Sequence, residues 1–258
     1  MPAAFAPQDL TEDHFLGGRL RLLQPRVGYR AATDPVLLAA AVPATPGQSV
    51  LDLGCGAGAA ALCLGVRVSG LILMGLELQP EYAALARENA ARNGLEFDVT
   101  EGDITDIPAH LRAQTFDHVI ANPPYYAPTS PAATDAGRDM AVRETAPASL
   151  WVDIGLRRLK SGGVLTMIHL AERLPALLGA LEGRASASVL PLCPRAGRAA
   201  TRVIVQMRKG GRTPFRLLAP LVLHEGAAHD GDRDSFAPDV RDILRGGTAL
   251  DRFDITPS

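Results

Sequence analysis

The sequence lacks several features that would place the protein outside the cytoplasm. It contains no run of 18 uncharged apolar residues, so no segment predicts a membrane-spanning helix. The first residues show no basic start followed by a long apolar core, and no secretory signal is expected. Cysteine is scarce: Cys55, Cys63 and Cys193 form no C-x-x-C pair, and their odd number argues against a disulfide framework. These absences predict a soluble protein of a reducing, cytoplasmic compartment without membrane association.

Metal-ligand spacing is also absent, because none of the 6 histidines forms a pair such as H-x-x-x-H. No metal site is therefore expected. Acidic residues are missing from Gly183 to His224, although the whole chain has a net charge of −2. A basic block of this kind is typical of a surface that binds a polyanion, because neutralised phosphates release counterions. An ordinary solvated pair of strands with surface arginines is the alternative. The block contains Arg184, Arg195, Arg198, Arg202, Arg208, Lys209, Arg212 and Arg216.

Strand and helix signals alternate through most of the chain. Alternation of this kind predicts an α/β protein with a mostly parallel sheet that is covered by helices on both faces, as in Rossmann-like folds. Strands are expected at 49–53, 71–77, 97–101, 116–121, 164–169, 186–192 and 202–208, which gives a seven-stranded sheet. Helices are expected at 57–67, 80–92, 147–160 and 171–181.

Three regions are expected along the chain. Residues 1–45 predict a short β hairpin around Gly17 and Gly18, followed by a helix that Asp34 caps and that extends through Ala41. Residues 46–225 form the main α/β domain. Within it, residues 127–147, which are rich in Ala, Pro, Thr and Asp, predict a long loop. Residues 226–258 form an acidic C-terminal extension.

A glycine-rich loop follows the first strand of the main domain. Gly54, Gly56 and Ala59 satisfy the dinucleotide fingerprint G-x-G-x-x-G/A, which is a weak signal by itself. Asp52 distinguishes between two cofactor classes, because its carboxylate would repel the pyrophosphate of a nicotinamide cofactor and attract the ammonium group of S-adenosylmethionine. The loop therefore predicts S-adenosylmethionine as cofactor, bound by Asp52, Gly54, Gly56 and Gly58.

Acidic residues at the ends of the next two strands extend this predicted cofactor site. Glu77 ends the second strand 25 residues after Asp52, where an acid can accept hydrogen bonds from both ribose hydroxyls. Leu78 is assigned to the same pocket. Asp103 follows the third strand and could accept from the adenine amino group, with Ile104 beside the ring; a turn-capping aspartate is the alternative.

The tetrapeptide Asn122-Pro123-Pro124-Tyr125 stands at the end of the fourth strand. An exocyclic amino nitrogen is a poor nucleophile because its lone pair is delocalised into the ring. The side-chain oxygen of Asn122 and the carbonyl of Pro123 could each accept one hydrogen of this amino group. The nitrogen lone pair would then point at the methyl carbon of the cofactor, and the positive charge that develops on the nitrogen would be stabilised. The two prolines fix the backbone, and Tyr125 offers a face for stacking on an extruded base. The motif predicts methyl transfer to a planar nitrogen, and Asn122 is also assigned to the cofactor pocket.

These residues resemble class I S-adenosylmethionine-dependent methyltransferases with the N-P-P-Y signature, specifically the bacterial tRNA(Val) adenine-N6-methyltransferase family. The segment from Gln24 to Leu38 is similar to that family's G-x-x-x-x-x-D-x-x-L-L-A segment. The resemblance implies methylation of N6 of the adenosine beside the anticodon of a valine tRNA, with S-adenosylhomocysteine as product. It also implies that Tyr29 and Thr33 help to shape the cofactor pocket. With RNA as partner, the basic block predicts RNA binding by Arg195, Arg198, Arg202, Arg208, Lys209 and Arg212.

Three other functions stay open. Release-factor glutamine methyltransferases share the N-P-P-Y motif, but they carry a helical substrate domain before the glycine loop, whereas only about 50 residues precede Asp52 here. Adenine methylation in ribosomal RNA or DNA uses the same chemistry. A non-catalytic RNA-binding module that kept the fold is the alternative from another class, and the intact Gly54, Glu77 and Asn122 argue against it.

Overall fold

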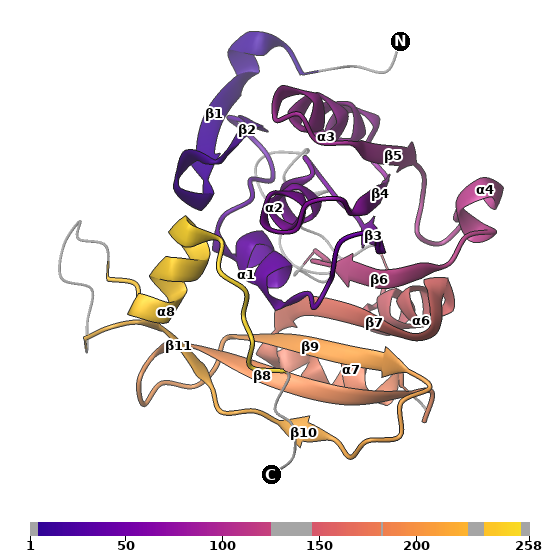
Figure 1. Ribbon diagram of the computed structural model, residues 1–258, viewed down its shortest axis with the longest axis vertical. Coiled ribbons are helices and arrows are strands. Elements are labelled where there is room, and N and C mark those ends of the chain that lie inside the picture. The colour runs from indigo at the N-terminus through magenta and orange to yellow at the C-terminus, as the bar shows by residue number, and fades with distance from the viewer. Residues whose placement is uncertain (1–4, 125–145, 182, 227–234, 254–258) are drawn as a thin grey trace.

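Among the described residues, the main sheet has nine strands in the order β10-β8-β9-β7-β6-β3-β4-β5, with β11 also paired to β8 (Figure 1). The structure, a computed structural model, describes residues 5–124, 146–181, 183–226 and 235–253. The expected parallel character is confirmed, since only β9 runs antiparallel to its neighbours. The expected count of seven is too low, because two short strands pair in parallel beside β8. The strands are β3 (Ser49–Leu53), β4 (Ile72–Glu77), β5 (Phe97–Glu101), β6 (Phe116–Ala121), β7 (Leu159–Leu170), β8 (Ala185–Arg195), β9 (Arg202–Lys209), β10 (Arg216–Leu217) and β11 (Leu221–His224).

The order of these strands brings the two sequence motifs to one edge. β3 pairs in parallel with β4 on one side and with β6 on the other, so the direction of winding changes at β3. Leu53 at the end of β3 lies opposite Leu76 of β4 and Ala121 of β6. In open α/β sheets, ligands bind outside the carboxyl ends of the strands at such a change of direction. The glycine loop follows β3 and Asn122 follows β6, so both lie at this edge of the sheet.

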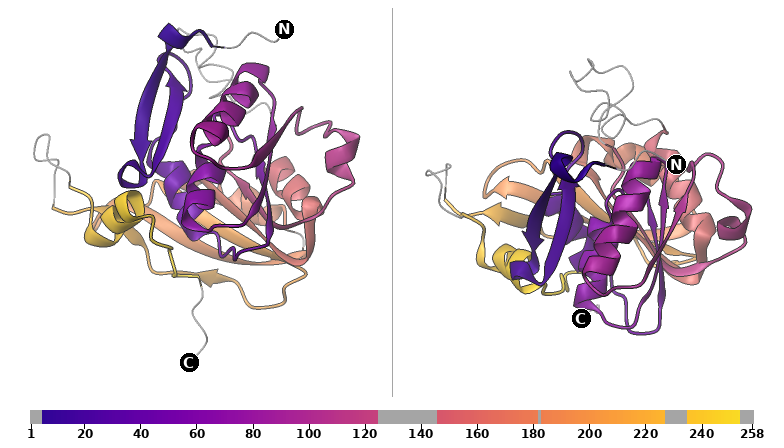
Figure 2. Two further views of the ribbon diagram at one scale, coloured as in Figure 1. Left: turned by 45° about the horizontal axis from the view of Figure 1, so that its top comes forward. Right: turned by 90° about the horizontal axis from the view of Figure 1, so that it is seen from above.

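Helices cover both faces of the sheet (Figure 2). One face packs against α1 (Thr33–Ala41), α2 (Ala59–Arg67) and α3 (Pro80–Arg92), and the other against α4 (Ala109–Arg112), α6 (Ala148–Arg158) and α7 (Leu174–Gly179). Each face of the sheet has its own apolar cluster, because successive side chains of a strand point to opposite faces. In β3, Val50 belongs to the first cluster, and Leu51 and Leu53 belong to the second. The two-faced cover predicted from the sequence is confirmed.

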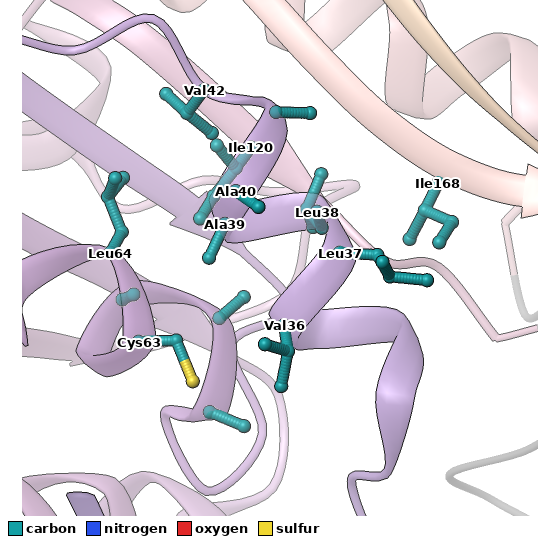
Figure 3. Packing of buried hydrophobic residues seen from close by; sticks show 14 of the residues in the cluster. Val36, Leu37, Leu38, Ala39, Ala40, Val42, Cys63, Leu64, Ile120 and Ile168 are labelled. Carbon is teal, nitrogen blue, oxygen red and sulfur yellow. The ribbon is translucent and has the colours of Figure 1, made fainter. Parts of the chain in front are cut away.

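Helix α1 is buried on nearly every side. Seven of its nine residues, from Pro35 to Ala41, are buried. Its apolar side chains face α2 and the sheet, where Ile120 and Ile168 lie (Figure 3). The helix begins near Asp34, as expected, but Asp34 does not cap it. The carboxylate of Asp34 instead accepts a hydrogen bond from Nε of Arg202, 3.1 Å away on β9.

The expected N-terminal hairpin is present as β1 (Leu10–Phe15) and β2 (Leu20–Pro25), joined by a short 3₁₀ turn, η2 (Leu16–Gly18). The side chain of Asn89 on α3 ties it to the main domain, because it accepts from the amide of Leu23 at 2.7 Å and donates to the carbonyl of Leu23 at 3.0 Å. In the C-terminal region, α8 (Pro238–Arg241) leads into η4 (Asp242–Gly246). These last turns lie against α1 and the hairpin, and the amide of Leu250 donates to the carbonyl of Ala40 at 2.8 Å. In Figure 1 they are the yellow segment beside α1.

Most of the predicted elements occur where the sequence placed them. The bounds of β3, α3, β5 and β6 agree with the expected ranges. β7 begins earlier than expected, and the helix expected at 171–181 is divided into the 3₁₀ turn η3 (Ala171–Arg173) and α7. The loop expected at 127–147 lies almost entirely outside the described residues. Among the described helices, none has the length and hydropathy needed to cross a lipid bilayer.

Candidate functional site

A cavity of about 180 Å³ opens at the carboxyl edge of the sheet. It lies where β3, β4, β5 and β6 end, and the segment between β2 and α1 closes one side. The topology therefore brings together side chains from positions as far apart in the sequence as Gln24 and Trp151. Of the residues that the sequence assigned to cofactor and substrate, those that line the cavity are Tyr29, Asp52, Gly54, Gly56, Glu77, Leu78, Asp103, Ile104, Asn122, Pro123 and Pro124.

The glycine loop forms the floor of this cavity. The amides of Gly54 and Cys55 donate to the carbonyl of Leu76, at 2.8 and 3.1 Å, and hold the loop against β4. Gly54 has a φ of +67°, and a Cβ there would lie 2.8 Å from the ring of Trp151. Gly56 has a φ of +54°, yet among the described residues a Cβ there would meet only the ring of Tyr29, at 3.8 Å. A ligand can therefore approach the backbone closely at Gly56.

Gly58 does not line the cavity, although the sequence analysis assigned it to the cofactor. It stands at the N-terminus of α2 with a φ of +88°, and a Cβ there would crowd Leu62, Phe97 and Ala86 at 3.2 to 3.4 Å. A left-handed backbone and tight packing account for glycine at this position. Thr33, the first residue of α1, also lies outside the lining residues; from that helix Pro35 reaches the cavity.

Two buried acids lie beside the glycine loop. Asp52 is 2% exposed and accepts a hydrogen bond from the amide of Ala61 at 3.2 Å. Burial, and to a smaller extent the carboxylate of Glu77, raise the pKa of Asp52 to about 8. Burial also raises the pKa of Glu77, despite hydrogen bonds from the amides of Gln79 at 2.9 Å and Gly56 at 2.8 Å. Two carboxyl groups with raised pKa values form a site that favours a cationic ligand.

Asp103 has the local contact that the sequence analysis gave as its alternative. One carboxylate oxygen accepts from the amide of Thr105 at 2.7 Å, which closes a turn. The residue nevertheless lines the cavity together with the buried Ile104. Across from them, Leu78 also lines the cavity and is 45% exposed. An exposed leucine and a buried isoleucine that border the cavity are suited to a flat, apolar ring.

The described part of the Asn-Pro-Pro-Tyr motif borders the same cavity. β6 positions Asn122, because its last residue, Ala121, is held opposite both Leu53 and Met167. The Nδ2 group of Asn122 donates a hydrogen bond to the hydroxyl of Tyr29 at 3.2 Å. Tyr125 lies outside the described residues.

Sequence reasoning missed several residues of the cavity wall. Gln24 of β2 is 2% exposed; its amide oxygen accepts from the amide of Ala31 at 2.7 Å, and its nitrogen donates to Asp13 at 2.7 Å. Tyr82 of α3 also lines the cavity, as does Trp151 of α6. Trp151 also belongs to the apolar cluster behind the loop. None of these residues has a local motif that could have identified it.

The basic block is divided between the two ends of the sheet. β9 runs antiparallel to β7, so Arg202 lies opposite Leu170 at the carboxyl edge and Arg208 lies opposite Val164, about 20 Å away at 3.3 Å per residue.

The arginines at the carboxyl edge have partners within the protein. Arg202 is paired with Asp34, and Arg195 donates to the carbonyls of Glu225 and Gly226. Exposed Arg198 is at the same edge, in the turn between β8 and β9. Arg208, Lys209 and Arg212 are at or beyond the far end of β9, where Arg208 and Lys209 donate to backbone carbonyls of Gly162 and Leu159 at 2.8 and 2.7 Å.

Curated relatives share part of this chain. A protein from Yersinia enterocolitica named tRNA1(Val) (adenine(37)-N6)-methyltransferase is 36% identical over 119 residues, which are 45% of this chain and 47% of that protein. A protein of the same name from Photorhabdus laumondii is 34% identical over 46% of this chain and 50% of its own length. The chain thus spans about half the length of these two relatives. A third, from Porphyromonas gingivalis, is 33% identical over 64% of this chain and 68% of its own length.

Solved structures share the fold. A predicted O-methyltransferase from Agrobacterium tumefaciens superposes with a TM-score of 0.67 at 27% identity, over 84% of this chain and 97% of that chain. The methyltransferase subunit of a type I restriction-modification system from Streptococcus thermophilus superposes with a TM-score of 0.60 at 17% identity, over 83% of this chain and 51% of that chain. The model of the methyltransferase small domain matches residues 32–173, which is more than half of the sequence. The chain therefore belongs to the methyltransferase small domain family.

Proposed function

We propose that this protein transfers a methyl group from S-adenosylmethionine to the exocyclic N6 amine of an adenine in RNA, and that the RNA is a valine tRNA methylated beside the anticodon. The observation that carries the proposal is that Asn122 and Pro123 border the same cavity as the glycine loop and the acids Asp52 and Glu77. A site for a nucleoside-bearing cation and a pair of acceptors for an amine therefore meet at one edge of the sheet.

The residues present fit S-adenosylmethionine. The open approach to the backbone at Gly56 leaves room for a ligand, and the buried carboxyl groups of Asp52 and Glu77 would be stabilised in their ionised form by a bound cation. Leu78 and Ile104 would flank the adenine ring, and Asp103 lies beside them. When bound, this cofactor supplies an electrophilic methyl group on a sulfonium.

The chain's own residues would prepare the amine. The Oδ1 atom of Asn122 and the carbonyl of Pro123 would each accept one N6 hydrogen, which aims the nitrogen lone pair and stabilises the positive charge that develops on nitrogen. No strong base is needed before attack, because the proton can leave the nitrogen afterwards. The cavity is lined by apolar as well as polar side chains, so water would be largely displaced by the two ligands.

The substrate assignment is supported by the names of the curated relatives and by the basic side chains at the carboxyl edge. Phosphate contacts near the target base would help to position an RNA, and Arg195, Arg198 and Arg202 share the edge at which Asn122 lies. Glutamine methylation in a release factor is less well supported, because the curated relatives are named as tRNA methyltransferases.

The test is methyl transfer from labelled S-adenosylmethionine to total tRNA from a strain that lacks this protein, with nucleoside mass analysis of the product. We expect N6-methyladenosine in a valine tRNA with the wild-type protein and none with Asn122→Ala. Binding of S-adenosylmethionine to Asn122→Ala, measured by calorimetry, serves as the folding control. Label in ribosomal RNA or in a release factor would contradict the tRNA assignment, and label in no substrate would favour a non-catalytic RNA-binding module.

A further inference from the structure

The side chain of Asn122 is held by a residue from a distant part of the chain. Its Nδ2 group donates to the hydroxyl of Tyr29 at 3.2 Å, and Tyr29 stands 93 positions earlier, in the segment between β2 and α1. Both residues line the cavity. A planar amide has its oxygen and its nitrogen at opposite ends, so a partner at Nδ2 also determines the direction in which Oδ1 points.

Tyr29 is itself fixed in place independently of Asn122. Its backbone amide donates to the hydroxyl of Tyr82 at 3.0 Å, and the same hydroxyl donates to its backbone carbonyl at 3.2 Å. Its ring lies over the glycine loop near Gly56. Contacts with α3 and the loop therefore help to hold the Tyr29 ring where its hydroxyl meets Asn122.

The orientation of the amide matters because an amino group that is to be methylated presents two hydrogens. Oδ1 of Asn122 can accept one of them, whereas Nδ2 in the same place would oppose a donor to a donor. Burial and the nearby carboxylates of Asp34 and Asp52 raise the pKa of Tyr29 above its ordinary range. The hydroxyl therefore stays neutral at physiological pH.

We propose that Tyr29 is a positioning residue, whose hydroxyl accepts the hydrogen bond from Asn122 that turns Oδ1 toward the amine of the substrate. The inference rests on the proposed function, since it concerns how Asn122 meets an amine. Tyr29 acts through Asn122, and its ring separately forms part of the cavity wall. Removal of the hydroxyl alone should therefore affect turnover and leave cofactor binding nearly intact.

The test in turnover is a double-mutant cycle with Tyr29→Phe, Asn122→Ala and the double variant. Tyr29→Phe keeps the ring, and we expect kcat to fall about tenfold, as for the loss of one neutral hydrogen bond, with KM for RNA and Kd for S-adenosylmethionine changed less than about threefold. In the Asn122→Ala background, Tyr29→Phe should cause no further loss. An equal loss in both backgrounds, an unchanged kcat, or a faster reaction would overturn the inference. A faster reaction would mean that the hydroxyl donates to Oδ1 and holds the amide in the wrong orientation.

A second measurement does not depend on activity. The side-chain amide signals of Asn122 in ¹⁵N-labelled protein can be assigned from their absence in Asn122→Ala. We expect Tyr29→Phe to shift these signals and to speed exchange of the amide hydrogens with solvent, while the signals of Asn89 and Asn93 stay in place. Unchanged Asn122 signals would overturn the inference even if no RNA is methylated. If the signals shift but the wild-type protein methylates no RNA, the proposed function fails and the contact stands.

Discussion

The carboxylate of Glu77 joins the end of β4 to the glycine loop, since one of its oxygens accepts from the amide of Gly56 at 2.8 Å. The other oxygen accepts from the amide of Gln79 at 2.9 Å. Each carboxylate oxygen has a second lone pair, so the same group can bind hydroxyls of a ligand. Glu77 is thus both a structural tie and a candidate ligand for the ribose.

Glu77→Gln should weaken S-adenosylmethionine binding by about tenfold or more. The NH₂ group of the glutamine side chain would face the amide of Gly56 or of Gln79, and two donors cannot bond to each other. The variant also lacks the charged oxygen that would accept from the ribose. Isothermal titration calorimetry measures the effect. Glu101→Gln is the matched control: Glu101 lies opposite Glu77 on β5, and its carboxylate pairs with Arg87 at the surface, 3.0 Å away. Equal loss of affinity in both variants would contradict the role of Glu77.

Cofactor affinity should depend on pH through Asp52. Burial raises the pKa of this carboxyl from its ordinary value of 3.8 to about 8, so the cofactor-free protein holds a proton there at neutral pH. A bound cation favours the ionised form, and binding should therefore release a proton. We expect affinity for S-adenosylmethionine to rise by up to about tenfold per pH unit between about pH 5.5 and about pH 7. Asp52→Asn should bind weakly and lose this dependence; the same slope in the variant would refute the assignment.

The same carboxyl should lower the stability of the cofactor-free protein. An acid whose folded pKa is raised binds its proton more tightly in the folded state, so its stability cost is absent below about pH 4 and grows as the pH rises toward about 8. Asp52→Asn should therefore raise Tm at pH 8 and change it little at pH 4. Thermal denaturation at the two pH values, without cofactor, measures this difference. A Tm that falls at pH 8 would show that the carboxylate stabilises the free protein.

Gly54 should tolerate substitution less well than a glycine with a similar backbone elsewhere. Gly54→Ala combines a positive φ of +67° with a contact of 2.8 Å to the ring of Trp151, whereas Gly47 has a φ of +86° and no atom within 4 Å of a Cβ. We expect Gly47→Ala to cost about 1 kcal/mol of unfolding free energy, and Gly54→Ala to cost about 1 to 3 kcal/mol more. Urea denaturation measures both. Similar losses in the two variants would mean that Trp151 moves aside without cost.

The arginines at the two ends of β9 should differ in RNA binding. Arg195 and Arg198 lie at the edge that carries Asn122, and Arg208 and Arg212 lie at or beyond the other end. The Arg195→Ala, Arg198→Ala double variant should weaken RNA binding and reduce the slope of log affinity against log salt by about 1 to 2, with cofactor affinity unchanged. The Arg208→Ala, Arg212→Ala double variant removes the same charge and is the control. Filter binding at several salt concentrations measures RNA affinity and its salt dependence. Equal losses of RNA affinity in the two double variants would contradict the assignment of the RNA-binding surface to the carboxyl edge.

Arg202 needs separate treatment, because its guanidinium pairs with Asp34 at 3.1 Å. Both side chains are only partly exposed, so the pair holds β9 against the start of α1. Arg202→Ala is expected to lower Tm as well as RNA affinity. Loss of RNA affinity in this variant therefore does not identify Arg202 as a phosphate contact.

Local signals in the sequence predicted most of the sheet and its helices. The bounds of α3 follow from Pro80 at its first turn and from Asn93 and Gly94 at its end. In β5 buried and more exposed residues alternate, as in an edge strand, and the apolar run at the end of β6 is that of a buried strand. The early part of β7 was missed because Lys160, Ser161 and two glycines form no apolar pattern; only pairing with β6 makes it a strand. β10 and β11 are too short to have a period.

The sequence predicted those residues of the candidate site that stand at the ends of parallel strands. Asp52, Glu77 and Asn122 each stand at the end of a parallel strand, and such ends meet at one edge of a sheet. Gln24 and Tyr82 could not be found in this way, because they reach the cavity through contacts between the hairpin and α3 that no short pattern encodes. The division of the basic block likewise depends on the direction of β9, which composition does not reveal.

Methyl transfer to tRNA by paired wild-type and Asn122→Ala proteins tests the central claim most directly. The account predicts N6-methyladenosine in a valine tRNA with the wild-type protein and a loss of at least about a hundredfold in rate with Asn122→Ala. The change in S-adenosylmethionine affinity should be much smaller than the change in rate. Methylation of tRNA at an undiminished rate by Asn122→Ala would contradict the proposed use of this cavity. The same conclusion would follow if the wild-type protein bound S-adenosylmethionine and methylated no amine in RNA.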